Sequence, residues 1–337
     1  MALDPERRRN LYAMKLRSLV NEHLSTPALE VVGTDDGASA RLSDGGVAVL
    51  AEERIDRAIG TALALSVRSS SSEIEIFAEG ASGVLARRAM LFSGVINIWE
   101  IKGKEIELAR PDRPLDGLQT PELPALIAVM QGAGLEVVSE HGVIVGEVAG
   151  LEVARIVSDL NGDRIEVGVG AHDREAFALL HGHLPTTEAI ARVADVVKNH
   201  RMPGAEPHPL NRLGAERWLR ARLIAEPERI GAQKLEAAEP PVERTNLKEA
   251  VPAVAKGLTN DGKELVVVCA VGIDLDVLPF AADARLLHDP SAKLKVVVPQ
   301  RDAHQILFDL AGRLVHEAEI VGVDDNWRQW KPSPSVP

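Results

Sequence analysis

The segment VAVLAEERIDRAIGTALALSVRSSSSEIEIFAEGASGVLARRAMLFSGVINIWEI, residues 47–101, alternates between two hydrophobic periods. Apolar residues are continuous or in alternate positions at 47–50, 73–78 and 95–101, which predicts strands. They recur at helical spacing over 52–67 and 82–92. A β-α-β-α-β order of this kind predicts a sheet whose later strands are parallel and joined by crossover helices.

The residues before this segment predict a helix over 5–24 and two further strands, at 29–32 and 38–42. TDDGA and SDGG separate the three early strands and have the composition of turns, so we expect an antiparallel meander. The resulting order α-β-β-β-α-β resembles the core of the restriction-endonuclease-like nucleases. In that family the acidic residue and an E-x-K triplet lie on the hairpin strands before the first crossover helix. Here the triplet Glu100-Ile101-Lys102 ends the last strand, so the topology is expected without the nuclease motif.

The C-terminal part repeats the β-α-β-α-β order with strands at 264–271, 293–298 and 319–323 and helices over 276–287 and 302–315. The two parts share periods but few identities, which indicates a structural pseudo-repeat. Between them, hairpin-forming strands and helices predict an α+β domain. We therefore expect an α/β protein in which N- and C-terminal β-α-β-α-β units, with mixed or parallel sheets, flank a central α+β domain. The expected segments are an N-terminal domain (1–113), a central domain (118–200), a Pro-rich arm with an amphipathic Arg-rich helix (201–248), a C-terminal unit (249–326) and a Trp/Pro tail (327–337).

Composition narrows the function classes. The 337 residues carry a formal net charge of −12, which disfavours a nucleic-acid partner. The single cysteine, Cys269, cannot form an intramolecular disulfide and fits a reducing cytoplasm. No stretch approaches the roughly 18 apolar residues of a membrane span, so no membrane partner is expected. The phosphate-loop, dinucleotide-binding, nucleophile-elbow and C-x-x-C patterns do not occur in the sequence.

Carboxylates follow several predicted strands. The candidate catalytic residues are Glu52, Glu79 and Glu100, the last with Lys102 beside it, and Asp274 and Asp276 follow a strand of the C-terminal unit. Ligands of α/β proteins bind at such strand ends, and carboxylates could hold a divalent cation or act as acid and base. The alternative interpretation is that acidic residues at helix starts stabilise the helix dipole.

Histidines gather in the central part of the chain. The candidate metal ligands are His172, Asp173, His181 and His183, because a His-x-His pair binds zinc when a third ligand joins it. The alternative is a polar loop and a helix start. No cofactor is evident, and a divalent metal is the one that these groups would suit.

The candidate binding residues lie on the Arg-rich helix and in the tail. They are Arg212, Arg217, Trp218, Arg220, Trp327 and Trp330. An apolar stripe flanked by arginines fits docking on an acidic partner or on RNA; the alternative is docking on this protein's own acidic surface. Two tryptophans in a polar terminus suggest an anchor on a neighbouring domain or subunit.

Three stretches, VGVGAHDREAFALLHG, HPLNRLGAERWLRARL and VGIDLDVLPFAADARL, are similar to a family of uncharacterised proteins from high-GC actinobacteria, over nearly the full length. The resemblance implies a bacterial cytoplasmic protein and transfers no residue roles.

The leading functional hypothesis is a cytoplasmic binding protein whose partner is another protein or a second copy of itself. The alternative is a metal-dependent hydrolase or nuclease-like enzyme that uses the strand-end carboxylates or the central histidines.

Overall fold

The computed structural model describes residues 4–114, 119–160, 162–181, 184–243 and 250–330. The protein is a mixed α/β structure with three sheets, which confirms the expected fold class. The chain forms two compact units. Unit 1 comprises Met1–Pro114, Ile273–Leu286 and His304–Ile320, and unit 2 comprises Leu115–Gly272, Leu287–Ala303 and Val321–Pro337.

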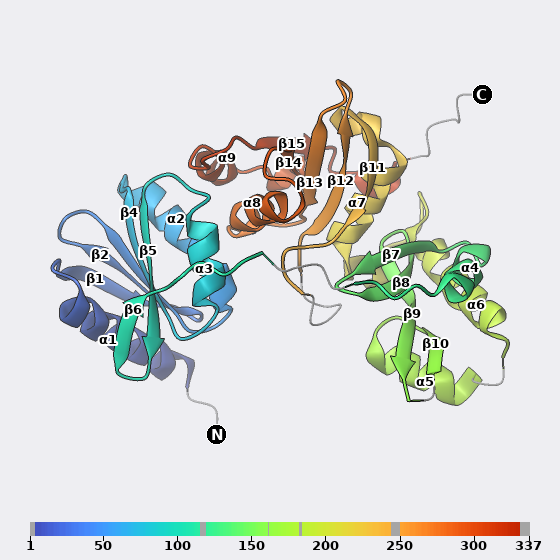
Figure 1. Cartoon of the computed structure of the whole chain (residues 1–337), viewed down its shortest axis with the longest axis horizontal. Helices are drawn as coiled ribbons and strands as arrows, with labels where there is room; N and C mark the ends of the chain where they lie inside the picture. Colours follow the sequence, from blue (N-terminus) through green and yellow to red (C-terminus); the bar gives the residue numbers. More distant parts are fainter. Residues whose placement is uncertain (1–3, 115–118, 161, 182–183, 244–249, 331–337) are drawn as a thin grey trace. The chain divides into compact units, whose positions relative to one another are not determined.

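Unit 1 is built on a six-stranded sheet whose strands lie side by side in chain order (Figure 1). The strands are β1 (Ala28–Gly33), β2 (Gly37–Leu42), β3 (Val47–Ala51), β4 (Glu73–Ala78), β5 (Val95–Lys102) and β6 (Glu105–Leu108). The first three form the expected antiparallel meander, and β3, β4 and β5 are parallel. The short strand β6, which sequence reasoning did not identify, returns antiparallel to β5.

Helix α1 (Pro5–His23) covers one face of this sheet. It begins where the Asp4 side chain accepts a hydrogen bond from the backbone of Arg7, with a proline in the first turn, as helix starts favour. Its buried Leu16, Leu19 and Val20 belong to the same core cluster as Ala48 and Leu50 of β3. Because side chains alternate along a strand, Val47 and Val49 point to the opposite face.

The opposite face is covered by helices that follow the parallel strands. After a short 3-10 turn, η1 (Ile55–Arg57), helix α2 (Ala58–Ser69) packs on β3 and β4, and α3 (Ser82–Ala89) packs on β5. Unit 1 also includes most of α8 (Val277–His288) and all of α9 (Gln305–Ala311). Helix α9 contacts α2, and the turn after α9 forms a two-residue antiparallel bridge, Leu314 with Phe92, at the end of α3.

Unit 2 contains an antiparallel four-stranded sheet in the order β10-β9-β8-β7. Its core joins Met130, Leu151, Val153 and Ile190, all at most 1% exposed. This is the α+β region that hairpin turns predicted. The elements are α4 (Pro124–Gly132), β7 (Glu136–Glu140), β8 (Val143–Val148), β9 (Leu151–Asp159), β10 (Gly162–Val167), α5 (Ala171–His181) and α6 (Thr186–Arg201).

The third sheet has the order β11-β12-β13-β14-β15, with antiparallel pairs β11/β12 and β12/β13 and a parallel pair β13/β14. This arrangement repeats that of β1 to β4, and helix α7 (Ala215–Ala225) precedes it as α1 precedes the first sheet. The repeat is therefore longer than the β-α-β-α-β order expected from the sequence. The strands are β11 (Ala232–Ala238), β12 (Ala253–Thr259), β13 (Glu264–Cys269), β14 (Lys293–Pro299) and β15 (Glu319–Val323).

Part of the segment predicted as an arm, 201–248, belongs to this sheet. Strand β11 has the sequence AQKLEAA, and its residues at 232, 235 and 238 are buried. Alanine, lysine and glutamate have low strand propensity, which is why the sequence pattern did not reveal it. Within the described ranges, none of the helices combines the length and the apolar composition that a bilayer crossing requires.

Candidate functional site

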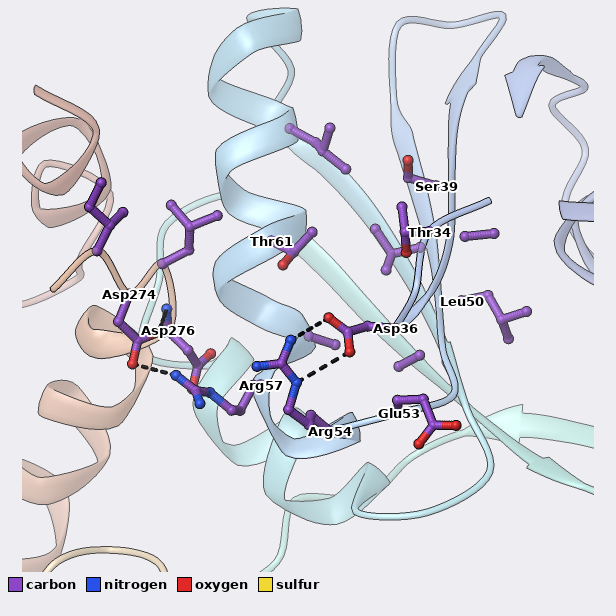
Figure 2. Close-up of a pocket in the computed structure, with 17 residues that line it drawn as sticks. Thr34, Asp36, Ser39, Leu50, Glu53, Arg54, Arg57, Thr61, Asp274 and Asp276 are labelled. Carbon is purple, nitrogen blue, oxygen red and sulfur yellow. Dashed lines mark hydrogen bonds and ion pairs between the residues drawn. The ribbon is translucent and has the colours of Figure 1, made fainter. Parts of the chain in front are cut away.

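Unit 1 contains a pocket of about 340 Å³ on the sheet face that α2 leaves open (Figure 2). Its floor is the β2–β3 hairpin, one wall is α2, and another wall is the loop before α8. This volume is in the range of small-molecule sites. The apolar lining consists of Ala38, Val49, Leu50, Ala51, Ala58, Leu65, Ile273 and Leu275, and the polar lining of Thr34, Asp36, Ser39, Glu53, Arg54, Arg57, Thr61, Asp274 and Asp276.

Two arginines from the turn after β3 each pair with an aspartate in this pocket. Arg54 donates from Nε to Asp36 Oδ1 at 3.2 Å and from Nη2 to Asp36 Oδ2 at 2.5 Å. Arg57 donates to Asp274, which lies 217 residues later in the chain. Figure 2 shows both pairs at the same end of the pocket. Arg54 has a φ of 44°, a left-handed conformation that costs a non-glycine residue energy and that clusters at functional sites.

Asp276 is the buried carboxyl group of the pocket, with 5% of its surface exposed. It accepts hydrogen bonds from the Gly60 backbone at 3.3 Å and from Arg88 Nη1 at 3.1 Å. Burial raises the pKa of Asp276 to about 7; the charge of Asp274 acts in the same direction, while Arg88 acts against it. Asp276 therefore changes charge near neutral pH.

Behind the pocket wall, Asp283 of α8 binds two consecutive arginines of α3. Arg87 donates from Nε and Nη2 to its two oxygens at 2.8 and 3.0 Å, and Arg88 Nε donates at 3.0 Å. All three side chains are at most 5% exposed. The fork of Arg87 matches the carboxylate geometry, so this network fixes α8 against α3 and positions the loop that carries Asp274 and Asp276.

The pocket lining contains more carboxyl groups than guanidinium groups. Its lining holds four carboxyl groups, from Asp36, Glu53, Asp274 and Asp276, and two guanidinium groups, from Arg54 and Arg57. Arg88 compensates Asp276 from behind the wall. Glu53, whose carboxylate reaches Tyr12 of α1, adds a further negative charge, so the lining as a whole favours a cation over an anion.

The predicted catalytic carboxylates lie elsewhere in unit 1. Glu52 and Glu79 do come together, because Lys15 Nζ of α1 contacts Glu52 at 2.7 Å and Glu79 at 2.5 Å. Burial acts against the charge of Lys15, but its bonds to these two carboxylates outweigh that effect and raise its pKa. The ammonium group thus lies between the two carboxylates. Glu100 pairs instead with Lys102 at 3.1 Å on β5, and Lys102 also reaches Glu107.

The structure does not bring together those predicted metal ligands whose side chains it describes. His172 is fully exposed, with Glu175 at 4.0 Å, and Asp173 accepts a hydrogen bond from the Val169 backbone at 2.6 Å. Asp173 therefore stabilises the start of α5, as its alternative interpretation proposed. His183 and the side chain of His181 lie outside the described residues. In the part of the chain that the structure covers, no three or more His, Cys, Asp or Glu side chains are arranged to hold a metal ion.

The predicted binding residues are mostly buried within unit 2. Arg217 Nη1 and Arg220 Nη2 donate to Glu147 at 2.8 and 3.2 Å, which is the docking on the protein's own acidic residues considered as an alternative. Trp218 packs edge-on against Trp327, with ring centroids 5.5 Å apart. Trp330 stacks under Arg229, and Arg212 is exposed. Partner binding through these residues stays a prediction.

Sequence reasoning named Asp274 and Asp276 at a strand end but missed Arg54 and Arg57. The signal available was the turn sequence EERIDR after β3, with charged residues on a helix start. No family model, curated protein or solved structure matches this chain. The geometry of the pocket is therefore what indicates a function for this chain.

Proposed function

We propose that this chain is a binding protein whose unit 1 pocket takes a small organic molecule with an apolar body and a cationic group. The observation that carries the proposal is the pairing of an apolar floor with a surplus of carboxyl groups at one end. Val49, Leu65 and Ile273 offer apolar contact to the body of such a ligand, and removing that surface from water favours binding.

The cationic group is expected at the end where Asp36 and Asp274 lie. Each carboxylate already binds one arginine, and each retains lone pairs for a second donor. Side chains on this rim are partly exposed, at 48% for Asp36 and 19% for Asp274, so a ligand can reach them from solvent. The paired arginines hold both carboxylates in place before the ligand arrives, which reduces the entropy lost on binding.

A matched pair of probes tests the proposal. Tryptamine and indole-3-acetate share an indole ring and differ in the sign of their charge, so titration calorimetry on the full chain separates the two contributions. We expect tryptamine to bind at least about tenfold more tightly, which corresponds to about 1.4 kcal/mol. Equal affinities, or tighter binding of indole-3-acetate, would contradict the proposed ligand class.

A pocket-filling variant assigns the binding to this site. Thr61 is an exposed residue of α2 that lines the pocket, and Thr61→Trp places a large ring there. Arg68→Trp adds the same ring at an exposed position of α2 outside the lining. Tryptamine binding should disappear in Thr61→Trp and persist in Arg68→Trp. Unchanged binding in both variants would place the probe at another site and reject the pocket.

A further inference from the structure

Arg217 of unit 2 has a buried guanidinium group with one edge unpaired. The residue is 3% exposed, and its Nη1 donates to Glu147 at 2.8 Å. Its Nε and Nη2 are buried and have no hydrogen-bond partner among the residues that the structure describes. These two nitrogens form the fork that binds two oxygens of a carboxylate or phosphate at once.

The two unpartnered nitrogens of Arg217 lie beside the start of α7. Gly214, the residue before this helix, has a φ of 54°, and among the described residues no side chain caps the helix. A Cβ atom at Gly214 would lie 3.4 Å from both Nε and Nη2 of Arg217, and 3.3 Å from the Gly150 carbonyl oxygen. The first N–H groups of an α-helix have no partner within the helix and carry partial positive charge. Both kinds of donor therefore meet at Gly214.

A second buried arginine adds positive charge nearby. Arg201 is 3% exposed, and it donates to the carbonyl groups of Ala149, Leu210 and Leu213, while its Nε has no partner in the described structure. Burial, and then the charge of Arg217, lower the pKa of Arg201 to about 9. The nearby carboxylates are Glu147, which also binds Arg220, and Glu216 in the first turn of α7.

We infer that the start of α7 binds a small oxyanion, such as phosphate, sulfate or a carboxylate, between Gly214, the free edge of Arg217 and Arg201. The fork of Arg217 would hold two oxygens, and the first backbone N–H groups of α7 would reach a third. Gly214 has no side chain to fill the space before the fork, where a Cβ atom would already be in close contact with Arg217. An anion here would compensate the positive charge of Arg217 and Arg201, since Glu147, the carboxylate that Arg217 binds, is also bound by Arg220.

The site is enclosed, so the ion can enter only when the segment that connects α6 to α7 moves away. Residues 202–214 connect α6 to α7 and contain only the short turn η2 (Pro209–Arg212). Several residues of this connection are exposed, including Met202 and Gly204. Arg201 binds the carbonyl groups of Leu210 and Leu213 in it, so anion binding should also tighten this segment.

Titration calorimetry on the full chain tests the inference with inorganic phosphate, sulfate and acetate, each against chloride at constant ionic strength. We expect saturable binding of at least one oxyanion at millimolar concentration, and the order of affinities identifies the preferred class. No saturable binding of any of the three would overturn the inference.

Two variants locate the site. Gly214→Ala puts a methyl group against the free edge, and Arg217→Lys keeps the charge but removes the fork; each should weaken oxyanion binding about tenfold. Gly231→Ala is the matched control, because Gly231 has a similar φ of 67° and caps the short turn η3 (Pro227–Ile230). Its affinity should equal that of the unmodified chain. Unchanged binding in both Gly214→Ala and Arg217→Lys would refute the assignment to α7.

Discussion

Replacing Asp283 with asparagine should strongly destabilise unit 1. Asp283 is completely buried on α8 and accepts three hydrogen bonds, two from Arg87 and one from Arg88. Asparagine keeps the volume of the side chain but removes its charge. It also replaces one acceptor oxygen with an amide group that cannot accept from the arginine nitrogens. Besides the amide oxygen of the new asparagine, Arg88 would keep the Asp276 carboxylate, and Arg87 would keep the backbone carbonyl groups of Asp112 and Arg113.

The expected loss of unfolding free energy follows from the burial of Asp283 and its two arginines. Removing one member of a buried ion pair costs about 3–5 kcal/mol, because the remaining charge stays uncompensated. The exposed pair Arg9–Asp35 gives a control inside the same unit, with an N–O distance of 2.9 Å and side chains 47% and 61% exposed. Exposed pairs contribute about 0–1 kcal/mol. Asp35→Asn should therefore be close to neutral.

Urea unfolding followed by far-UV circular dichroism measures both variants. The free energy of unfolding comes from the midpoint and slope of the transition, and comparison with tryptophan fluorescence reveals whether the units unfold separately. The expected loss is about 3 kcal/mol or more for Asp283→Asn, whereas Asp35→Asn should leave the transition midpoint nearly unchanged. Equal small losses in both variants would refute the claim that this network fixes α8.

Three further outcomes follow from the structure. The pKa of Asp276 is raised to about 7, against 3.8 in an unfolded chain, so the folded state binds this proton more tightly. The stability that protonated Asp276 contributes is therefore lost as pH rises from about 4 to about 7. In Asp276→Asn, the urea midpoint should depend less on pH over this range. Trp327→Ala should cost about 3–5 kcal/mol in unfolding free energy, because the side chain is fully buried against Trp218, and an unchanged midpoint would contradict this packing. Cys269 is fully buried, which raises the pKa of its thiol to about 12, so a thiol reagent should label it only in denaturant; rapid labelling of the native chain would contradict its placement.

The parallel strands and the helices of unit 1 could be predicted because the apolar residues in their sequences are the ones that the fold buries. The strand at 73–78 and the helix at 82–89 bury their apolar residues at the periods that the sequence shows. Strands β11 and β12 have a weaker sequence signal. Their sequences, AQKLEAA and AVAKGLT, are rich in alanine, lysine and glycine, and pairing with neighbouring strands determines their conformation.

The pocket could be predicted only in part. A carboxylate at a strand end can be read from the chain, and Asp274 was found in that way. Its partner Arg57 lies 217 residues earlier, and no local spacing relates the two positions. The same limit applies to Arg217, whose partner Glu147 is 70 residues away on another element. Pairs of this kind depend on tertiary packing, which a single sequence does not encode as a short pattern.

The most direct test of the proposed binding function is methyl NMR of the full chain during a titration with tryptamine. Val49, Leu65 and Ile273 line the pocket, and their methyl signals report on its occupation. We predict saturable shifts that are largest at these three residues and strengthen as pH rises through about 7, because the Asp276 carboxylate then gains its charge. Shifts that centre on other methyl groups, or signals that do not change, would contradict a cation-binding pocket in unit 1.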